Sequence, residues 1–233
     1  FSDAPGAIPD FVNHARYLQE IYLKADPKFT GRVTVPVLWD KQNHTIVNNE
    51  SREIMRMFDV EFAELATQNI DLYPPDLQQQ IDETIDKIYL PINIGVYRAG
   101  FATSQTAYEA AVTELFESFD RWENMLSQQR YLCGDKLTEA DLCMFVTLYR
   151  FDSVYHGLFK CNLRRIIDYP NLWNYLKDLY QRPEFKATCN FDHIKRGYYT
   201  SMTDLNPNRI VPKGPIVNFD ERHDRDRQET KTK

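Results

Sequence analysis

The sequence lacks the features that would tie it to a membrane, a nucleic acid or a metal ion. No stretch approaches the ~18 consecutive apolar residues of a membrane-spanning helix. The net charge is −6, which argues against a surface that follows a phosphate backbone. His, Cys, Asp and Glu nowhere recur at metal-ligand spacing. We therefore expect no membrane segment, no nucleic-acid partner and no metal.

Cysteine is scarce, and its positions match neither a CxxC motif nor a zinc site. The four are Cys133, Cys143, Cys161 and Cys189. The sequence also begins, at Phe1, without the basic segment and apolar run of a secretory signal. Cysteines in such a chain are expected to be reduced thiols, so the pattern predicts a cytoplasmic protein.

Apolar residues are sufficient for a sizeable core, since 42% of the chain is hydrophobic and 27% is charged. Helical spacing over residues 10–25 is followed by a β-branched segment, Arg32–Trp39, which predicts a strand. A polar turn and a second short strand, Thr45–Val47, complete a predicted hairpin. Glu50-Ser51 then begins an amphipathic helix.

A change of composition separates this part from the rest of the chain. Residues 68–74 are interpreted as a linker between a first domain, 1–67, and a second domain, 75–201. The second domain shows only helical periodicity, most clearly over Ala107–Leu126. Thr138–Asp141 predicts a helix start with a capping box, Asp141 standing in place of the usual Glu, and Phe185–His193 predicts a final short helix. Residues 202–233 carry several prolines and a charged end, which predicts an irregular tail whose last ten residues are disordered.

The predicted fold class is therefore α+β, with a small α/β piece before a larger all-α piece. A hairpin flanked by helices cannot bury both faces of a sheet, so the α/β piece is too small to fold alone. We expect a further strand–helix–strand unit to precede Phe1.

Two features of the α/β piece suit an extended peptide ligand. Pro36 is either an ordinary edge proline or the second residue of a cis Val35-Pro36 bond that turns the Val35 main chain toward a ligand. Glu50-Ser51 is either a plain N-cap or a site that holds a carboxylate at the helix start and an ammonium group on Glu50. A γ-glutamyl unit presents both groups on one carbon.

Together with the segment Thr138–Asp141, these features resemble the glutathione-transferase superfamily. A narrower resemblance is to the glutathionyl-hydroquinone reductases, or Xi class. It rests on four segments in the same order, namely Gly31–Asp40, Asn49–Ser51, Gly95–Ala102 and Asn190–Lys195. The resemblance implies an incomplete thioredoxin-like N-terminal domain, an all-α glutathione-transferase C-terminal domain and a homodimer.

The chemistry implied by the resemblance is thiol exchange with glutathione as co-substrate. In that family a thiolate in a Cys-Pro-Trp-Ala motif attacks the glutathionyl sulfur of a glutathionyl-hydroquinone, and hydroquinone leaves. A second glutathione resolves the mixed disulfide to glutathione disulfide. This sequence contains no Cys-Pro-Trp-Ala. We expect the motif upstream of Phe1, and the alternative is a natural form without the nucleophile.

The resemblance also implies roles for individual residues. Tyr97 matches the proton donor and acceptor, and Tyr155 and Tyr198 match tyrosines that lower the cysteine pKa, with Tyr199 as the alternative to Tyr198. Arg32 is expected to reach a carboxylate of glutathione. The glutathione-binding residues implied are Arg32, Val33, Thr34, Val35, Glu50 and Ser51. On composition alone, any one of fourteen tyrosines would be explained by packing.

Three functions fit these observations, and the first is preferred. It is a glutathione-dependent reductase of quinone-derived thioethers, acting in quinone detoxification. The second is a binding module of the same fold without turnover, because fold alone does not determine function. The third is a conventional glutathione transferase, which would conjugate glutathione to chlorodinitrobenzene. A cysteine upstream of Arg32 favours the first, and an alanine or serine there favours the second.

Overall fold

The structure is a computed structural model that describes residues 6–67 and 70–227. The chain divides into two compact units, Phe1–Asp71 and Leu72–Lys233. Parts of the predicted domains, residues 1–5, 68–69 and 228–233, lie outside the described residues. The predicted limits 1–67, 68–74, 75–201 and 202–233 stay predictions.

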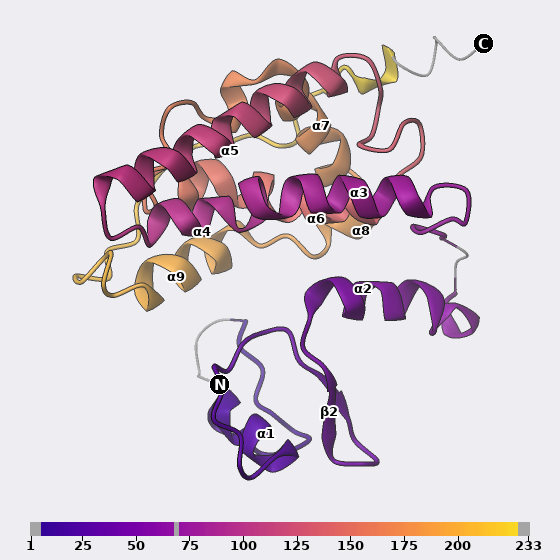
Figure 1. The fold of residues 1–233 in the computed structure, drawn as a ribbon, viewed down its shortest axis with the longest axis vertical. Coiled ribbons are helices and arrows are strands. Elements are labelled where there is room, and N and C mark those ends of the chain that lie inside the picture. The colour runs from indigo at the N-terminus through magenta and orange to yellow at the C-terminus, as the bar shows by residue number, and fades with distance from the viewer. Residues whose placement is uncertain (1–5, 68–69, 228–233) are drawn as a thin grey trace. The chain divides into compact units, whose positions relative to one another are not determined.

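The first unit contains a two-stranded sheet with short helices around it (Figure 1). Its elements are α1 (Leu18–Ala25), β1 (Leu38–Asp40), β2 (Thr45–Asn48), α2 (Ser51–Val60) and a 3₁₀ turn, η1 (Ala63–Leu65). The strands pair antiparallel with Trp39 opposite Ile46. This confirms the predicted hairpin and the predicted helix at Ser51.

Most of the predicted strand Arg32–Trp39 is not a strand, so that prediction was wrong. The ladder begins only at Leu38, which pairs with Asn48 at the end of the hairpin. A strand persists only where a neighbouring backbone supplies its hydrogen bonds. Before Leu38 no such neighbour exists among the described residues, and the main chain of Thr34 bonds to the Tyr22 hydroxyl instead.

The helix expected over residues 10–25 also begins later, at Leu18. The Asp10 carboxylate accepts hydrogen bonds from the main-chain N–H groups of Val12, Asn13 and Ala15. An aspartate that bonds the backbone just after itself favours a turn over a helix. These three bonds explain why the periodic apolar residues before Tyr17 do not continue the helix.

The second unit has no strand among its described residues and is built from helices. They are α3 (Gln78–Ile88), η2 (Tyr89–Asn93), α4 (Gly95–Gly100), α5 (Gln105–Leu126), α6 (Glu139–Arg150), η3 (Phe151–Tyr155), η4 (Ile166–Asp168), α7 (Pro170–Tyr180), α8 (Pro183–Lys186) and α9 (Phe191–Ser201). Both η2 and η3 are π-helical, and η4 is a 3₁₀ turn. Within residues 6–67 and 70–227, no helix combines the length and apolarity needed to cross a membrane.

The core of this unit follows the predicted periodicity of α5. Leu115, Phe119, Trp122 and Leu126 recur at spacings of three and four and are all buried. Residues at these spacings lie on one face of a helix, so burying that face orients the whole of α5. The short α4 packs against it and is thereby held in place (Figure 1).

The start of α6 confirms the predicted capping box. Asp141 accepts hydrogen bonds from the Thr138 N–H at 2.9 Å and the Thr138 hydroxyl at 3.2 Å. It also accepts from the Leu132 N–H and the Tyr175 hydroxyl of α7. Burial raises the pKa of Asp141, whereas these bonds oppose the shift. One carboxylate thus joins α6, α7 and the preceding loop.

The single short helix expected over Phe185–His193 was a wrong prediction. The chain forms α8 and then breaks before α9, which continues to Ser201. The Asn190 side chain accepts a hydrogen bond from the His193 N–H, so Asn190 is the N-cap of a new helix. The longer α9 carries Tyr198 and Tyr199.

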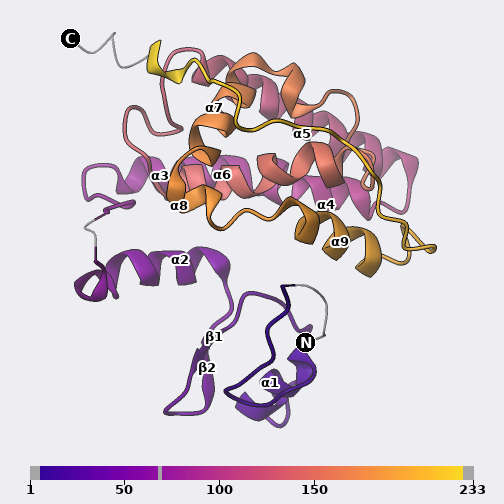
Figure 2. The same ribbon diagram turned by 180° about the vertical axis from the view of Figure 1, so that it is seen from behind.

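The segment after α9 is irregular but not wholly disordered, which corrects part of the prediction for the last ten residues. Figure 2 shows it running back across the helical unit toward α7. Phe219 packs on Tyr149 and Tyr180, both with ring centroids 5.0 Å away. Arg225 is fully buried. Its guanidinium donates to three carbonyls at the end of α5, those of Leu126, Gln129 and Arg130.

Arg225→Met should lower the free energy of unfolding by about 2–4 kcal/mol, because it removes three buried hydrogen bonds to carbonyls at the end of α5 while keeping most of the side-chain volume. Urea denaturation followed by circular dichroism would measure this loss. The control is Arg222→Met, since the Arg222 side chain is exposed and only its carbonyl is bonded. Equal stability of the two variants would contradict the anchoring role of Arg225.

Candidate functional site

Three tyrosine hydroxyls meet in the second unit. Tyr97 lies in α4, Tyr155 in η3 and Tyr198 in α9. The Tyr97 and Tyr198 hydroxyl oxygens are 2.5 Å apart, those of Tyr155 and Tyr198 are 2.9 Å apart, and those of Tyr97 and Tyr155 are 3.4 Å apart. The structure therefore brings together the three tyrosines that the sequence singled out. Their catalytic roles stay predictions.

Two π-helical turns position this tyrosine cluster. The turn η2 leads into α4, and η3 contains Tyr155 itself. From η2, the Asn93 amide donates to the Cys143 carbonyl at 2.8 Å and to the Thr147 hydroxyl at 2.7 Å, both in α6. This fastens α4 to α6. Single π turns recur at functional sites because they redirect side chains within a continuous helix.

Aromatic rings surround the three hydroxyls. The Phe159 ring is fully buried, with its centroid 5.4 Å from those of Tyr97 and Tyr155 and 6.1 Å from that of Tyr198. Phe101 stacks on Tyr97 with an interplanar angle of 23° and is 50% exposed. The cluster thus has a rigid apolar base and one accessible aromatic flank.

The environment keeps at least two of the three hydroxyls neutral. Burial raises the pKa of Tyr155, and the neighbouring Tyr198 and Tyr97 raise it further. Burial also raises the pKa of Tyr198, to about 12, although its hydrogen bond with Tyr155 acts in the other direction. Neutral phenols are hydrogen-bond donors, and a donor stabilises a nearby anion.

Tyr199 does not join the tyrosine cluster. The Tyr199 hydroxyl lies beside Gly157, and its oxygen is 3.1 Å from the position that a Cβ would occupy at residue 157. The same hydroxyl interacts with the backbone of Leu158. Successive residues of a helix point about 100° apart, so only one of the two tyrosines of α9 reaches Tyr97. Of the two alternatives left by the sequence, Tyr198 has the geometry required.

In the first unit the Val35-Pro36 peptide bond is cis. This is one of the two alternatives left open for Pro36. Val35 is 77% exposed, and its main-chain N–H and C=O have no hydrogen-bond partner within the described part of the chain. An exposed, unpaired N–H and C=O on one residue can bond the main chain of an extended peptide.

Glu50 and Ser51 lie at the start of α2, where Glu50 is the N-cap. Both side chains are exposed, and neither has a hydrogen-bond partner among the described residues. The Glu50 N–H is taken by the Asn48 side chain at 2.6 Å. The Glu50 carboxylate is therefore not used as a cap and remains available to a cation.

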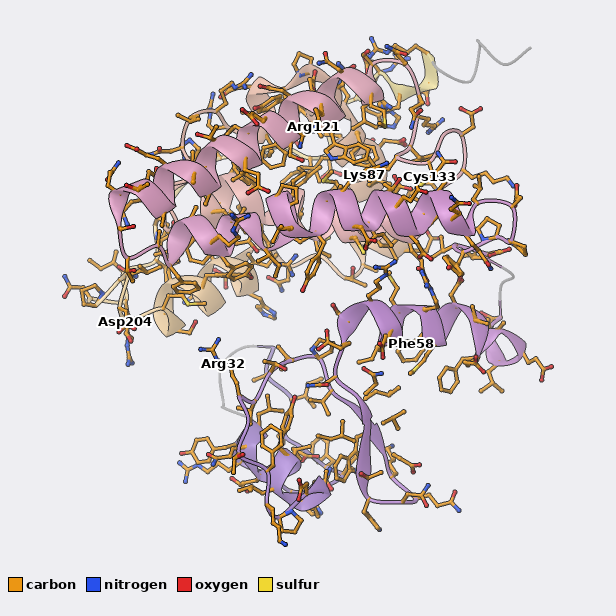
Figure 3. All side chains as sticks on the ribbon, viewed as in Figure 1. Arg32, Phe58, Lys87, Arg121, Cys133 and Asp204 are labelled. Carbon is orange, nitrogen blue, oxygen red and sulfur yellow. The ribbon has the colours of Figure 1, made fainter. Side chains whose placement is uncertain are left out.

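The remaining predicted binding residues precede the hairpin. Arg32 is exposed and stands out from the loop before β1 (Figure 3). Val33 is half-buried, whereas Thr34 is exposed but its main chain is fully bonded to Tyr22. Tyr22 thus occupies the main chain of Thr34, whereas the main chain of Val35 is unpaired among the described residues. Ligand binding by Arg32, Val33 and Thr34 stays a prediction.

Sequence reasoning missed Tyr22, which lies in α1. The helical spacing of apolar residues over 10–25 predicted only a core position for Tyr22, and its side chain is indeed only 4% exposed. Its hydroxyl bonds the main chain of Thr34 and the side chain of Asn49. Burial raises the pKa of Tyr22, but the hydrogen bonds with Thr34 and Asn49 outweigh it and lower that pKa overall. Periodicity contains no signal for such a contact.

Three cysteines of the second unit, Cys133, Cys161 and Cys189, do not have the character of nucleophiles. Burial raises the pKa of Cys133 (Figure 3) and Cys189, and it raises the pKa of Cys161 to about 12. A reactive cysteine needs the opposite shift, because the thiolate is the nucleophile. Within residues 6–67 and 70–227, no three His, Cys, Asp or Glu side chains are grouped to hold a metal ion.

Known proteins resemble this chain over nearly its whole length. The family described as "Glutathione S-transferase, C-terminal domain" matches residues 105–178. The glutathionyl-hydroquinone reductase YqjG of Escherichia coli is 52% identical over 97% of this chain and 69% of its own length. The glutathionyl-hydroquinone reductase PcpF of Sphingobium chlorophenolicum is 46% identical over 92% of this chain and 69% of its own length.

Solved structures show the same likeness in three dimensions. The Xi-class glutathione transferase of Natrialba magadii is 53% identical, with a TM-score of 0.95 over 97% of this chain and 69% of that chain. The glutathione-bound structure of YqjG gives a TM-score of 0.94 over 97% of this chain and 74% of that chain.

Gly100→Ala should disturb the tyrosine cluster. A Cβ at residue 100 would lie 2.6 Å from Cδ1 of the fully buried Phe159 ring and closer still to its Cγ. Overpacking of this kind costs about 1–3 kcal/mol. Urea denaturation and near-ultraviolet circular dichroism should show lower stability and a changed tyrosine signal.

The control is Gly197→Ala, beside Tyr198 in α9, where an added Cβ meets nothing within 4 Å. Alanine favours a helix over glycine, so this variant should be as stable as the original chain or more stable. A Gly100→Ala variant that matched it would show that the site tolerates a Cβ.

Tyr198→Phe should change how stability depends on pH. The neutral hydroxyl of Tyr198 contributes stability that is fully present below the unfolded tyrosine pKa of about 10. That contribution is lost as pH rises toward the folded pKa of about 12. The stability difference between the original chain and the variant should therefore shrink between about pH 10 and pH 12, by at most about 1.4 kcal/mol per pH unit. Unfolding by urea at each pH measures it, and a constant difference would contradict the raised pKa.

Proposed function

This chain belongs to the Xi class of glutathione transferases, the family of the glutathionyl-hydroquinone reductases, and from that membership we propose that it removes glutathione from glutathionyl-hydroquinones. The products are hydroquinone and glutathione disulfide. Membership confirms the predicted fold, an incomplete thioredoxin-like domain followed by an all-α glutathione-transferase domain. The observation that carries the proposal is the cluster of three tyrosine hydroxyls at residues 97, 155 and 198.

Glutathione is the proposed co-substrate, bound by the first unit. The unpaired main chain of Val35 would bond the cysteinyl residue of the tripeptide. Glu50 would hold the γ-glutamyl ammonium group, while Ser51 and the N-terminus of α2 would hold its carboxylate. The exposed Arg32 would hold a second carboxylate. The relative YqjG has been solved with glutathione bound, which supports this assignment.

The proposed reaction balances in two thiol-exchange steps. A protein thiolate attacks the glutathionyl sulfur, and the bond between that sulfur and the ring carbon breaks. The ring carbon keeps the electron pair and takes up a proton, which gives the hydroquinone. The thiolate of a second glutathione then attacks the mixed disulfide, so that glutathione disulfide leaves and the protein thiolate is restored.

The tyrosine cluster supplies what the first step needs besides a nucleophile. Tyr97 would deliver the proton to the ring carbon, because its hydroxyl is half-buried and bonded to a second donor. Tyr155 and Tyr198 stay neutral and would donate hydrogen bonds to the thiolate, which lowers the pKa of a cysteine. The accessible ring of Phe101 suits a flat aromatic leaving group.

Raised pKa values make Cys133, Cys161 and Cys189 poor nucleophiles. We propose that the nucleophile is a cysteine upstream of Phe1, since this chain spans 69% of the length of YqjG. A cytoplasmic location and a homodimer complete the proposal. The four free cysteines fit a reducing compartment, and the resemblance to this family supports the homodimer.

The decisive assay measures hydroquinone released from a glutathionyl-hydroquinone by the full-length protein. Tyr97→Phe should lose roughly 10²–10⁴-fold in rate, the usual contribution of a positioned proton donor, while glutathione affinity is retained. Tyr89→Phe is the control, because Tyr89 is 54% exposed and lies outside the tyrosine cluster.

Two results would argue against the proposal. Unchanged turnover by Tyr97→Phe would remove Tyr97 from the mechanism. Rapid conjugation of glutathione to chlorodinitrobenzene, with little hydroquinone release, would favour a conventional glutathione transferase instead.

A further inference from the structure

We infer that Tyr22 is a positioning residue for the γ-glutamyl peptide, holding the Val35 and Glu50 ends of the binding site at a fixed separation. This inference rests on the proposed function, because it takes the main chain at Val35 and the start of α2 as the glutathione site. Tyr22 itself would not touch the ligand. Its hydroxyl bonds the residue that precedes each end, Thr34 before Val35 and Asn49 before Glu50.

The Tyr22 hydroxyl has no bonding capacity left for anything else. It donates to the Thr34 carbonyl at 2.8 Å and accepts from the Thr34 N–H at 3.3 Å and the Asn49 amide at 3.0 Å. A phenol has one proton and two lone pairs, so these three bonds saturate it. The ring is held as well, since it is buried and packs on Phe29 with centroids 4.8 Å apart.

No backbone ladder performs this task. The hairpin ends at the Leu38–Asn48 pair, so residues 34 and 49 lie beyond it. Besides the Tyr22 hydroxyl, the only hydrogen bond that joins them in the described chain is a long one of 3.4 Å between the Asn49 amide and the Thr34 hydroxyl. The Tyr22 hydroxyl therefore makes the two main-chain hydrogen bonds to Thr34 that a neighbouring strand would otherwise make. The Tyr22 side chain that carries this hydroxyl is buried.

The consequence for binding follows from the bonds. With both main-chain groups of Thr34 held by Tyr22, the next residue is left with its own N–H and C=O unpaired and exposed. A ligand that bonds Val35 at one end and Glu50 at the other needs both ends in place at once. Without the hydroxyl the ligand would have to order the loop itself, and this weakens binding.

The test is glutathione binding to the full-length protein, measured by isothermal titration calorimetry. Tyr22→Phe removes only the hydroxyl and should weaken binding about tenfold, or ~1.4 kcal/mol. Tyr17→Phe is the matched control, because Tyr17 precedes the same helix and is 60% exposed. That variant should bind as the original chain does.

A second variant separates positioning from a general loss of stability. Asn49→Ala removes the link from Tyr22 toward Glu50 and the long contact of Asn49 with the Thr34 hydroxyl, but it leaves both bonds between Tyr22 and the Thr34 main chain in place. It should therefore weaken binding by a smaller factor. If both residues act through one hydroxyl, the double variant Tyr22→Phe/Asn49→Ala should lose less than the sum of the two single losses in binding free energy. Thermal melting without ligand, run in parallel, reports stability alone.

The outcomes distinguish this inference from the proposed function. Glutathione binding by Tyr22→Phe equal to that of the original chain would overturn the inference and leave the proposed function intact. Strictly additive losses in the double variant would also overturn it, because Tyr22 and Asn49 would then act independently. Failure of the original protein to bind glutathione would overturn the proposed function and, with it, this inference.

Discussion

Main-chain N–H and C=O groups need partners when they are withdrawn from water, and in this chain polar side chains supply them at three places where a ladder or helix ends. The Tyr22 hydroxyl does this for Thr34, the Asp141 carboxylate for Leu132, and the Arg225 guanidinium for the end of α5. Each of these side chains comes from another segment than the group it bonds. Satisfying a main-chain group therefore also joins two parts of the molecule.

The tyrosine cluster follows a different rule, since its hydroxyls bond one another. Tyr155 is buried and Tyr198 is partly buried, and the desolvation that keeps them neutral also makes them donors. Their rings pack on the fully buried Phe159, so the hydroxyls meet without help from a flexible loop. A set of neutral donors held on rigid helices is preorganised for an anion that forms during a reaction.

Local patterns in the sequence predicted much of the framework correctly. The hairpin, the helix at Ser51, the face of α5 and the capping box at Thr138 all depend on residues close to one another in the chain. Two failures, the late start of α1 and the break before α9, arose from short-range bonds of Asp10 and Asn190. The others occurred where distant residues decide the outcome. Arg32–Val37 has strand composition but no neighbouring strand among the described residues, and the charged residues near Arg225 looked disordered although that side chain is buried.

The candidate site likewise has features that local sequence motifs predict and others that depend on contacts between distant residues. The sequence by itself predicted which residues form it, because the motifs around Val35, Glu50 and Tyr97 are contiguous and can be matched one by one. Only the tertiary structure decided that Tyr198 and not Tyr199 bonds Tyr97, and that Tyr22 joins Thr34 to Asn49. A hydrogen bond depends on the separation and direction of two atoms, and for residues far apart in the chain those are set by packing rather than by spacing in the sequence.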